Sequence, residues 1–196
     1  MQLLSVDMAS GTEDMLSLAQ NPSLTQCNLF VPPSSANFSF NAGSFEGCTS
    51  MERLGLQYQR ALSLQPDCFS ALSALVSLTL ADCGLSAVPS AVTPLVKLNR
   101  LDISLDEDLV IDESGAGVLR TLKKLRMLDV VKSKPAVHTV PSLQALFNLV
   151  DTFRDEGFPL HVNLDPTCSD PFEPDVLFCG FGTHSQQGSQ WFSSTS

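Results

Sequence analysis

Apolar residues follow a short pattern that returns several times along this chain. Its clearest copy is the stretch from Leu75 to Pro89, LVSLTLADCGLSAVP, in which the order is L-x-x-L-x-L-x-x-C-x-L. Side chains alternate between the two faces of a strand, so the two apolar residues of each L-x-L share one face of a short β-strand. The pattern therefore predicts a series of short strands. Further copies of L-x-x-L-x-L, one of them with cysteine in an apolar position, begin at Leu24, Met51, Leu98 and Leu125.

The copies are almost evenly spaced. Shorter matches at Leu4-Ser-Val6 and Leu160-His-Val162 extend the series toward both ends of the chain. The first apolar residues of the successive L-x-L motifs are residues 4, 27, 54, 78, 101, 128 and 160. The steps between successive positions have similar lengths, except that the last step is longer. One such unit cannot bury its apolar face alone, whereas stacked units cover one another. We therefore expect parallel neighbouring strands, with an insertion before the last one.

The pattern and its spacing resemble the leucine-rich repeat, whose period of about 20–29 residues includes every step but the last. The resemblance implies an α/β fold: a leucine-rich-repeat solenoid with a curved parallel sheet on its concave side and helices, 3₁₀ turns and loops on its convex side. It covers residues 1–164 as one repeat domain of about six to seven repeats, the first of them truncated. For residues 165–196 we predict a C-terminal tail that forms a partial cap and is then disordered.

The segments between the predicted strands carry weaker signals. Residues 142–156 and 113–124 place apolar side chains at helical spacing, and we predict a helix over each range. Residues 66–75 are predicted as a helix or a 3₁₀ turn, and residues 85–95 as extended chain. Residues 31–47 are rich in Pro, Ser, Asn and Gly, which indicates a loop.

The charge of the chain limits its partners. The formal net charge of the 196 residues is −10. Nucleic acids and anionic membranes are bound by basic surfaces, so this charge disfavours both as partners. The first residues lack the regions of a signal peptide, and no apolar run approaches the roughly 20 residues that cross a bilayer. We therefore expect a cytoplasmic protein with no cofactor and no small-molecule substrate.

Cys83, in the clearest copy, is the first candidate for chemistry. As a residue type it suits a nucleophile, a metal ligand, half of a disulfide or a purely structural position. The chain has six cysteines, none in a C-x-x-C motif. A catalytic thiol needs a base, and no histidine is near Cys83 in the sequence. The resemblance implies a side chain that points inward at the turn leaving the strand, which is the role that we predict. Cys27, in an apolar slot, is predicted to be a core residue.

The residues that alternate with the apolar ones form the predicted binding surface. On the resemblance, they face the concave side and make the chain a non-catalytic protein–protein interaction module for a protein of unknown identity. The candidate partner-binding residues are Arg53, Gln57, Ser77, Thr79, Arg100, Asp102, Ser104, Met127 and Asp129.

Two other functions stay open at this point. The chain can be the substrate-recognition part of a larger protein, such as a ubiquitin ligase of the F-box type or a receptor, because similar repeats occur in such proteins and the series begins inside a repeat. Alternatively, Asp102, Asp129 and His161 lie in one predicted row and offer the ligands of a two-carboxylate, one-histidine metal site or a carboxylate pair for acid–base chemistry. We rank this alternative lowest, since the position between the two apolar residues is simply solvent-facing.

Overall fold

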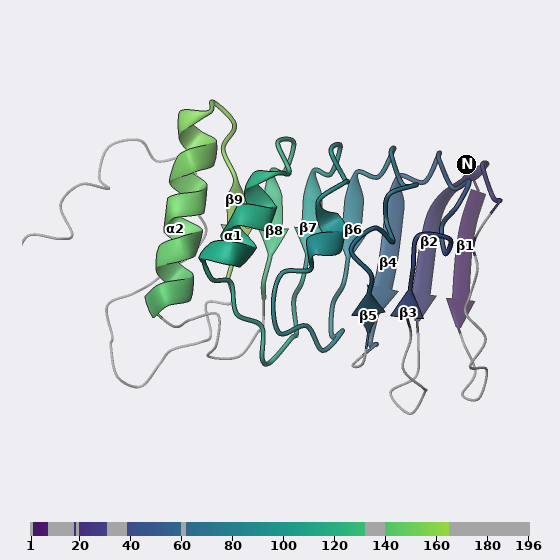
Figure 1. Ribbon diagram of the computed structural model, residues 1–196, viewed down its shortest axis with the longest axis horizontal. Coiled ribbons are helices and arrows are strands. Elements are labelled where there is room, and N and C mark those ends of the chain that lie inside the picture. The colour runs from purple at the N-terminus through teal and green to yellow at the C-terminus, as the bar shows by residue number, and fades with distance from the viewer. Residues whose placement is uncertain are drawn as a thin grey trace, which may run out of the picture.

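A computed structural model describes residues 2–7, 18, 20–30, 39–59, 62–131 and 140–164. This part of the chain is a mixed α/β structure with a seven-stranded sheet, in which all strands are parallel and neighbours follow one another in chain order (Figure 1). The predicted tail, residues 165–196, lies outside the described residues. The strands of the main sheet are β1 (Gln2–Asp7), β2 (Leu24–Phe30), β4 (Arg53–Gln57), β6 (Ser77–Thr79), β7 (Arg100–Asp102), β8 (Met127–Asp129) and β9 (His161–Asn163).

A second, two-stranded parallel sheet lies in the returning segments. It pairs β3 (Ser39–Phe40) with β5 (Ser63–Leu64). The prediction of a loop over residues 31–47 missed β3, while residues 31–38 of that range lie outside the described residues. Phe40 of β3 is buried and its ring stacks on that of Phe45, with 5.3 Å between ring centroids, so this small sheet closes the core opposite the main one.

The register of the main sheet aligns the predicted central positions, with one exception. Strand pairing places residues 4, 27, 54, 78, 101 and 128 side by side. At the last step Val162 pairs with Leu128, so the prediction of residue 160 was wrong by two residues. Leu160 is itself buried, just before the strand. Two apolar residues two positions apart both satisfied the pattern there, and the unusual length of the last step left the choice between them open.

One carbonyl group just before each of β4, β6 and β7 helps to fix this register. The Glu52 carbonyl oxygen accepts hydrogen bonds from the backbone N–H groups of Val76 and Ser77, at 2.8 and 3.0 Å. The Val76 carbonyl then accepts from residues 99 and 100, and the Asn99 carbonyl from residues 126 and 127. Each acceptor lies two residues before the central position of its strand. The entry of the next strand is therefore held by two hydrogen bonds at the start of the ladder.

Two successive turns lead into each of the middle strands. Before β6, the Leu72 N–H donates to the Phe69 carbonyl (3.0 Å) and the Leu75 N–H donates to the Leu72 carbonyl (3.1 Å). The same pair of i→i+3 hydrogen bonds precedes β4, β7 and β8, within residues 45–51, 92–98 and 119–125. Because about three residues complete one such turn, every third side chain points the same way. Phe69, Leu72 and Leu75 are accordingly all buried.

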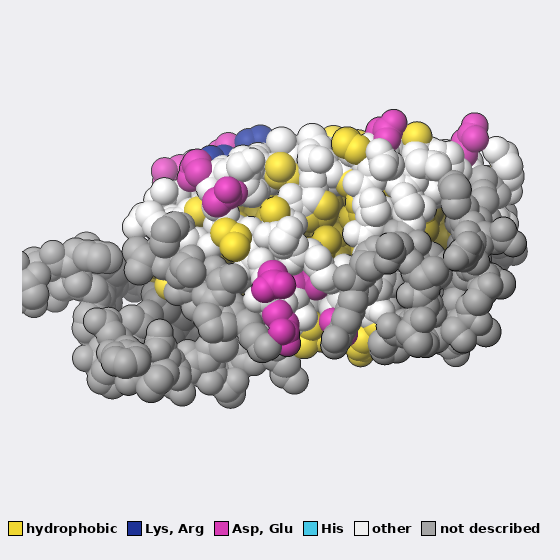
Figure 2. Space-filling view, turned by 60° about the horizontal axis from the view of Figure 1, so that its bottom comes forward, with side chains coloured by type: hydrophobic (Ala, Val, Ile, Leu, Met, Phe, Trp, Pro, Cys, Tyr) yellow, Lys and Arg dark blue, Asp and Glu magenta, His cyan; other side chains and the backbone are white. Residues whose placement is uncertain are grey.

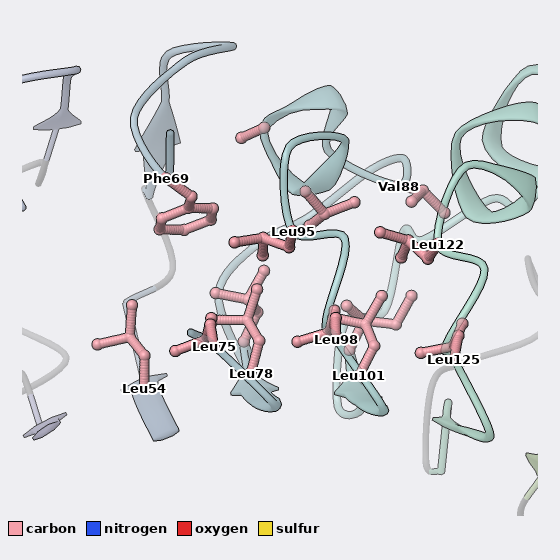
Figure 3. Close-up of a cluster of buried hydrophobic side chains, with 14 of the residues drawn as sticks. Leu54, Phe69, Leu75, Leu78, Val88, Leu95, Leu98, Leu101, Leu122 and Leu125 are labelled. Atoms are coloured by element: carbon pink, nitrogen blue, oxygen red, sulfur yellow. The ribbon is translucent and has the colours of Figure 1, made fainter. Parts of the chain in front are cut away.

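The core lies between the sheet and these turns. In Figure 3, Leu54, Leu78 and Leu101 extend from their strands toward Phe69, Leu95 and Leu122, which come from the returning segments. Each of these side chains is almost fully buried. Burying one such side chain contributes roughly 1.5–3 kcal/mol. Since each repeat supplies the same set of positions, the core continues from one repeat to the next as a single cluster.

The two helices cover the end of the sheet at β8 and β9, where they lie side by side (Figure 1). Helix α1 (Glu113–Arg120) begins at Asp112, whose carboxylate accepts a hydrogen bond from the Gly115 N–H at 2.8 Å. It ends four residues before the predicted boundary, because the i→i+3 turns toward β8 take over there. Helix α2 (Val140–Asp155) begins two residues earlier than predicted. No helix of the described ranges has the length and apolar character needed to cross a membrane.

The other returning segments give one prediction that agrees with the structure and one that needs correction. Residues 66–75 form consecutive i→i+3 turns, which is the second of the two predicted alternatives, a helix or a 3₁₀ turn. Residues 85–95, predicted as extended, contain the 3₁₀ helix η1 (Ser90–Val92). The signal for turns in this segment was the three-residue spacing of Val92, Leu95 and Leu98, which leads into β7.

The turns after β4, β6 and β7 each contain a residue with positive φ. Tyr58, Asp82 and Leu105 have φ values of 61°, 54° and 69°. Each lies four residues after the central position of its strand. This conformation is uncommon for residues other than glycine and costs roughly 1–2 kcal/mol. The following residues, Gln59, Cys83 and Asp106, point into the protein and are buried.

The two glycines of α1 offer a matched test of helix packing. An added Cβ at Gly117 meets no atom within 4 Å, so Gly117→Ala should raise the free energy of unfolding by about 0.5–1 kcal/mol, because alanine loses less backbone entropy in a helix. At Gly115 the same Cβ would lie 3.2 Å from Val88 Cγ2, so Gly115→Ala should gain less or lose stability. Urea unfolding of both variants measures this, and equal effects would contradict it.

Candidate binding face and the buried turn residues

The side of the sheet away from the core, here called the outer face, carries two rows of aligned side chains. The first row crosses β2 to β9 and the second lies two residues further along each strand. Adjacent residues in a row are about 4.8 Å apart, the spacing of neighbouring strands. The first row is Gln26, Arg53, Ser77, Arg100, Met127 and His161; the second is Asn28, Gly55, Thr79, Asp102, Asp129 and Asn163.

The predicted binding residues differ in how accessible they are. Arg53 and Arg100 are exposed, and Gln57, Ser77, Thr79, Asp102 and Met127 are partly exposed. Ser104 and Asp129, in contrast, are buried. Ser104 Oγ accepts a hydrogen bond from the Val131 N–H at 3.0 Å and thereby links two repeats.

Asp129 is the centre of a small polar network that spans three strands. Arg100 Nη2 of β7 lies 2.8 Å from Asp129 Oδ2 of β8, and Asn163 Nδ2 of β9 donates a hydrogen bond to Asp129 Oδ1. A buried carboxylate is tolerated when it is paired in this way. Asn163 was missed because the register of the last strand was shifted in the prediction; the longer step before β9 was the only hint.

The proposed metal site at Asp102, Asp129 and His161 does not form as predicted. His161 lies in the first row beside Met127, while Asn163 is the neighbour of Asp129 in the second row. The error follows from the two-residue shift at β9. Within the ranges that the structure describes, no group of three His, Cys, Asp or Glu side chains is arranged to hold a metal ion.

Cys83 occupies a buried turn position, as predicted. Its thiol donates a hydrogen bond to the Leu56 carbonyl of the preceding repeat at 3.0 Å. The four described cysteines, Cys27, Cys48, Cys68 and Cys83, are all buried and none is in a disulfide. Burial raises the pKa of Cys83 to about 12, so it carries a neutral thiol near pH 7. A nucleophilic role would need the thiolate.

Asp106 occupies the same turn position one repeat further on. Its Oδ1 accepts hydrogen bonds from the Cys83 N–H (2.8 Å) and the Gly84 N–H (2.6 Å), so the carboxyl group joins two repeats. Oδ2 is buried and has no hydrogen-bond partner among the described residues. Burial raises the pKa of Asp106 to about 6, against the opposing effect of the backbone N–H donors. The sequence patterns described above assigned no role to Asp106.

Acidic side chains also mark the edge where the strands end. Figure 2 shows them in the middle of this edge, whereas Lys and Arg side chains are visible only at the upper left. Glu107 and Asp108, which follow the turn after β7, are exposed.

Comparison with known proteins adds no relative. No protein-family model matches the chain, and no curated protein matches it.

Replacing Asp106 should change how stability depends on pH. A carboxyl group whose folded pKa is about 6 and ordinary pKa is 3.8 stabilises the fold below pH 4, and this contribution is lost as the pH rises through 6. Asp106→Asn keeps the Oδ1 acceptor and cannot ionise. The variant should gain on the order of 1–3 kcal/mol relative to wild type between pH 4 and pH 7.

Chemical unfolding of both proteins at several pH values measures this difference. Other carboxylates titrate in both proteins, so the difference between them isolates Asp106. In the variant, the side-chain amide nitrogen lies near the position of the unpartnered Oδ2. Its effect on the free energy of unfolding is the same at every pH, so it adds only a constant to the difference between the two proteins. A difference that stays constant from pH 4 to pH 7 would show that Asp106 is not the titrating group.

Proposed function

We propose that the chain is a leucine-rich-repeat protein whose described repeats form a solenoid. Four regularities support this: parallel strands in chain order, steps of similar length between the central positions of β1 to β8, paired turns before the middle strands, and a buried residue after a positive-φ turn. The buried residue after the positive-φ turn is Gln59, Cys83 and Asp106 in three successive repeats. Each repeat meets mainly the repeats next to it, which is how solenoids distribute their stability.

Removal of one whole repeat tests this architecture. Deleting residues 79–101 joins Leu78 to Asp102 and removes one full step between central positions. If the repeats are equivalent units, the shortened protein should retain its circular dichroism spectrum and unfold cooperatively at lower stability. The matched control deletes residues 79–90, which removes about half a repeat and destroys the register. Loss of folded structure in both deletions to the same extent would argue against a solenoid.

We propose that the protein is a non-catalytic binding module and that its outer face contacts a protein partner. The observation that carries this proposal is the outer face itself, where exposed and partly exposed polar side chains stand in register on a rigid sheet. A surface that is ordered before binding loses little conformational entropy when a partner docks. Arginine is also among the residue types enriched at interface hot spots.

Affinity capture with a charge-matched control tests the proposal. Arg53→Glu/Arg100→Glu changes the charge of the outer face by four units, and Lys97→Glu/Lys124→Glu makes the same change at exposed residues outside its two rows. Proteins captured from native extract by wild type should be lost with the arginine variant and kept with the lysine variant, as quantified by mass spectrometry. Equal capture by all three proteins would exclude the outer face as the binding surface.

A further inference from the structure

The charged groups of the outer face are unevenly distributed. Over β2 to β6 its two rows hold, besides Gly55, an arginine, two amides and two hydroxyl groups, at Arg53, Gln26, Asn28, Ser77 and Thr79. Over β7 and β8 the second row instead carries the carboxylates of Asp102 and Asp129. The acidic side chains of the two rows are therefore two or more strands away from Arg53.

The guanidinium group of Arg53 has no ion-pair partner among the described carboxylates. It is exposed on β4, and no ion pair joins it to an acidic residue in the part of the chain that the structure describes. Arg100, two strands away, is held by Asp129 at 2.8 Å. An arginine side chain presents a planar fork of N–H groups that matches a carboxylate with two hydrogen bonds. Arg53 is thus the position on this face where an incoming carboxylate meets an unpaired charge.

Asp102 is the complementary position. Its Oδ1 accepts one hydrogen bond, from the Ser104 N–H at 3.1 Å, and the side chain is partly exposed. The nearest arginine of the first row, Arg100, pairs with Asp129 rather than with Asp102. No described cation forms an ion pair with Asp102. A basic side chain of a partner would therefore find an uncompensated carboxylate here.

The geometry sets the distance between the two charges. Arg53 and Asp102 are two strands and one row apart, which corresponds to about 12 Å between their Cα atoms. In an extended peptide, residues three or four positions apart are about 10–13 Å from each other. An extended segment that crosses the strands can accordingly place one charged side chain at each position.

We propose that the partner presents an extended segment with an acidic side chain over Arg53 and a basic side chain three or four residues away over Asp102. This inference rests on the proposed binding role of the outer face and specifies its partner.

Short peptides test this charge pattern directly. The probe is acetyl-Asp-Ser-Ser-Ser-Lys-amide, added to the full chain labelled with ¹⁵N and followed by the amide chemical shifts. The controls carry two acidic or two basic ends in place of the mixed pair. We expect the mixed peptide to shift residues of β4 to β7 and to bind at least fivefold more tightly than either control. Arg53→Gln and Asp102→Asn should each weaken binding about fivefold or more, while Lys97→Gln, at an exposed cation outside the two rows, should not.

Several outcomes overturn the proposal. They are equal binding of all three peptides, no shift at about 10 mM peptide, which lies beyond weak millimolar affinity, and shifts confined to Glu107 and Asp108 at the acidic edge. The variants also separate this inference from the proposed function. If captured partners are lost with Arg53→Glu/Arg100→Glu but unaffected by Arg53→Gln and Asp102→Asn, the face binds a protein through other contacts and only the charge pattern is wrong.

Discussion

The carbonyl group two residues before the central position of each strand holds the next repeat in place. At Glu52, Val76 and Asn99 this oxygen accepts two backbone N–H groups from the following repeat. A shift of one residue would break both bonds and turn the apolar side chains of the strand outward. Because the bonds involve only the backbone, they repeat without any requirement on the side chain. The alignment of Leu54, Leu78 and Leu101 in the core depends on this constraint.

The outer face follows from the same register. Once the inward residues are aligned, the residues between them stand in rows on the opposite side of the sheet, whatever their chemistry. Whether a charged side chain in these rows has a partner depends, in contrast, on the residues of the neighbouring strands. Arg100 and Asn163 converge on Asp129 because β7, β8 and β9 are neighbours, whereas Arg53 remains without an acid on its own strand or on β6. A repetitive backbone thus supports a surface that does not repeat.

Strand positions were readable from the sequence, and the details that depend on contacts were not. The L-x-L pattern located β1, β2, β4, β6, β7 and β8, since a strand that buries one face must alternate. It failed at β9, where Leu160 and Val162 satisfy the same alternation. The burial of Asp129 and Ser104 was also missed, because it is caused by side chains from neighbouring repeats, and no local pattern contains that information. The three-residue spacing of Phe69, Leu72 and Leu75 favours the 3₁₀ turn over the helix, the two alternatives predicted for residues 66–75.

The positive-φ turns have a consequence for how this protein folds. Tyr58, Asp82 and Leu105 adopt a backbone conformation that two of these three residue types strongly disfavour in isolation. Local preference and final structure therefore disagree at the same place in three successive repeats. The surrounding contacts, among them the hydrogen bonds that the Cys83 and Gly84 N–H groups donate to Asp106, offset this cost. Because these contacts come from the next repeat, we expect each turn to be stable only together with its neighbours and folding to begin with more than one repeat.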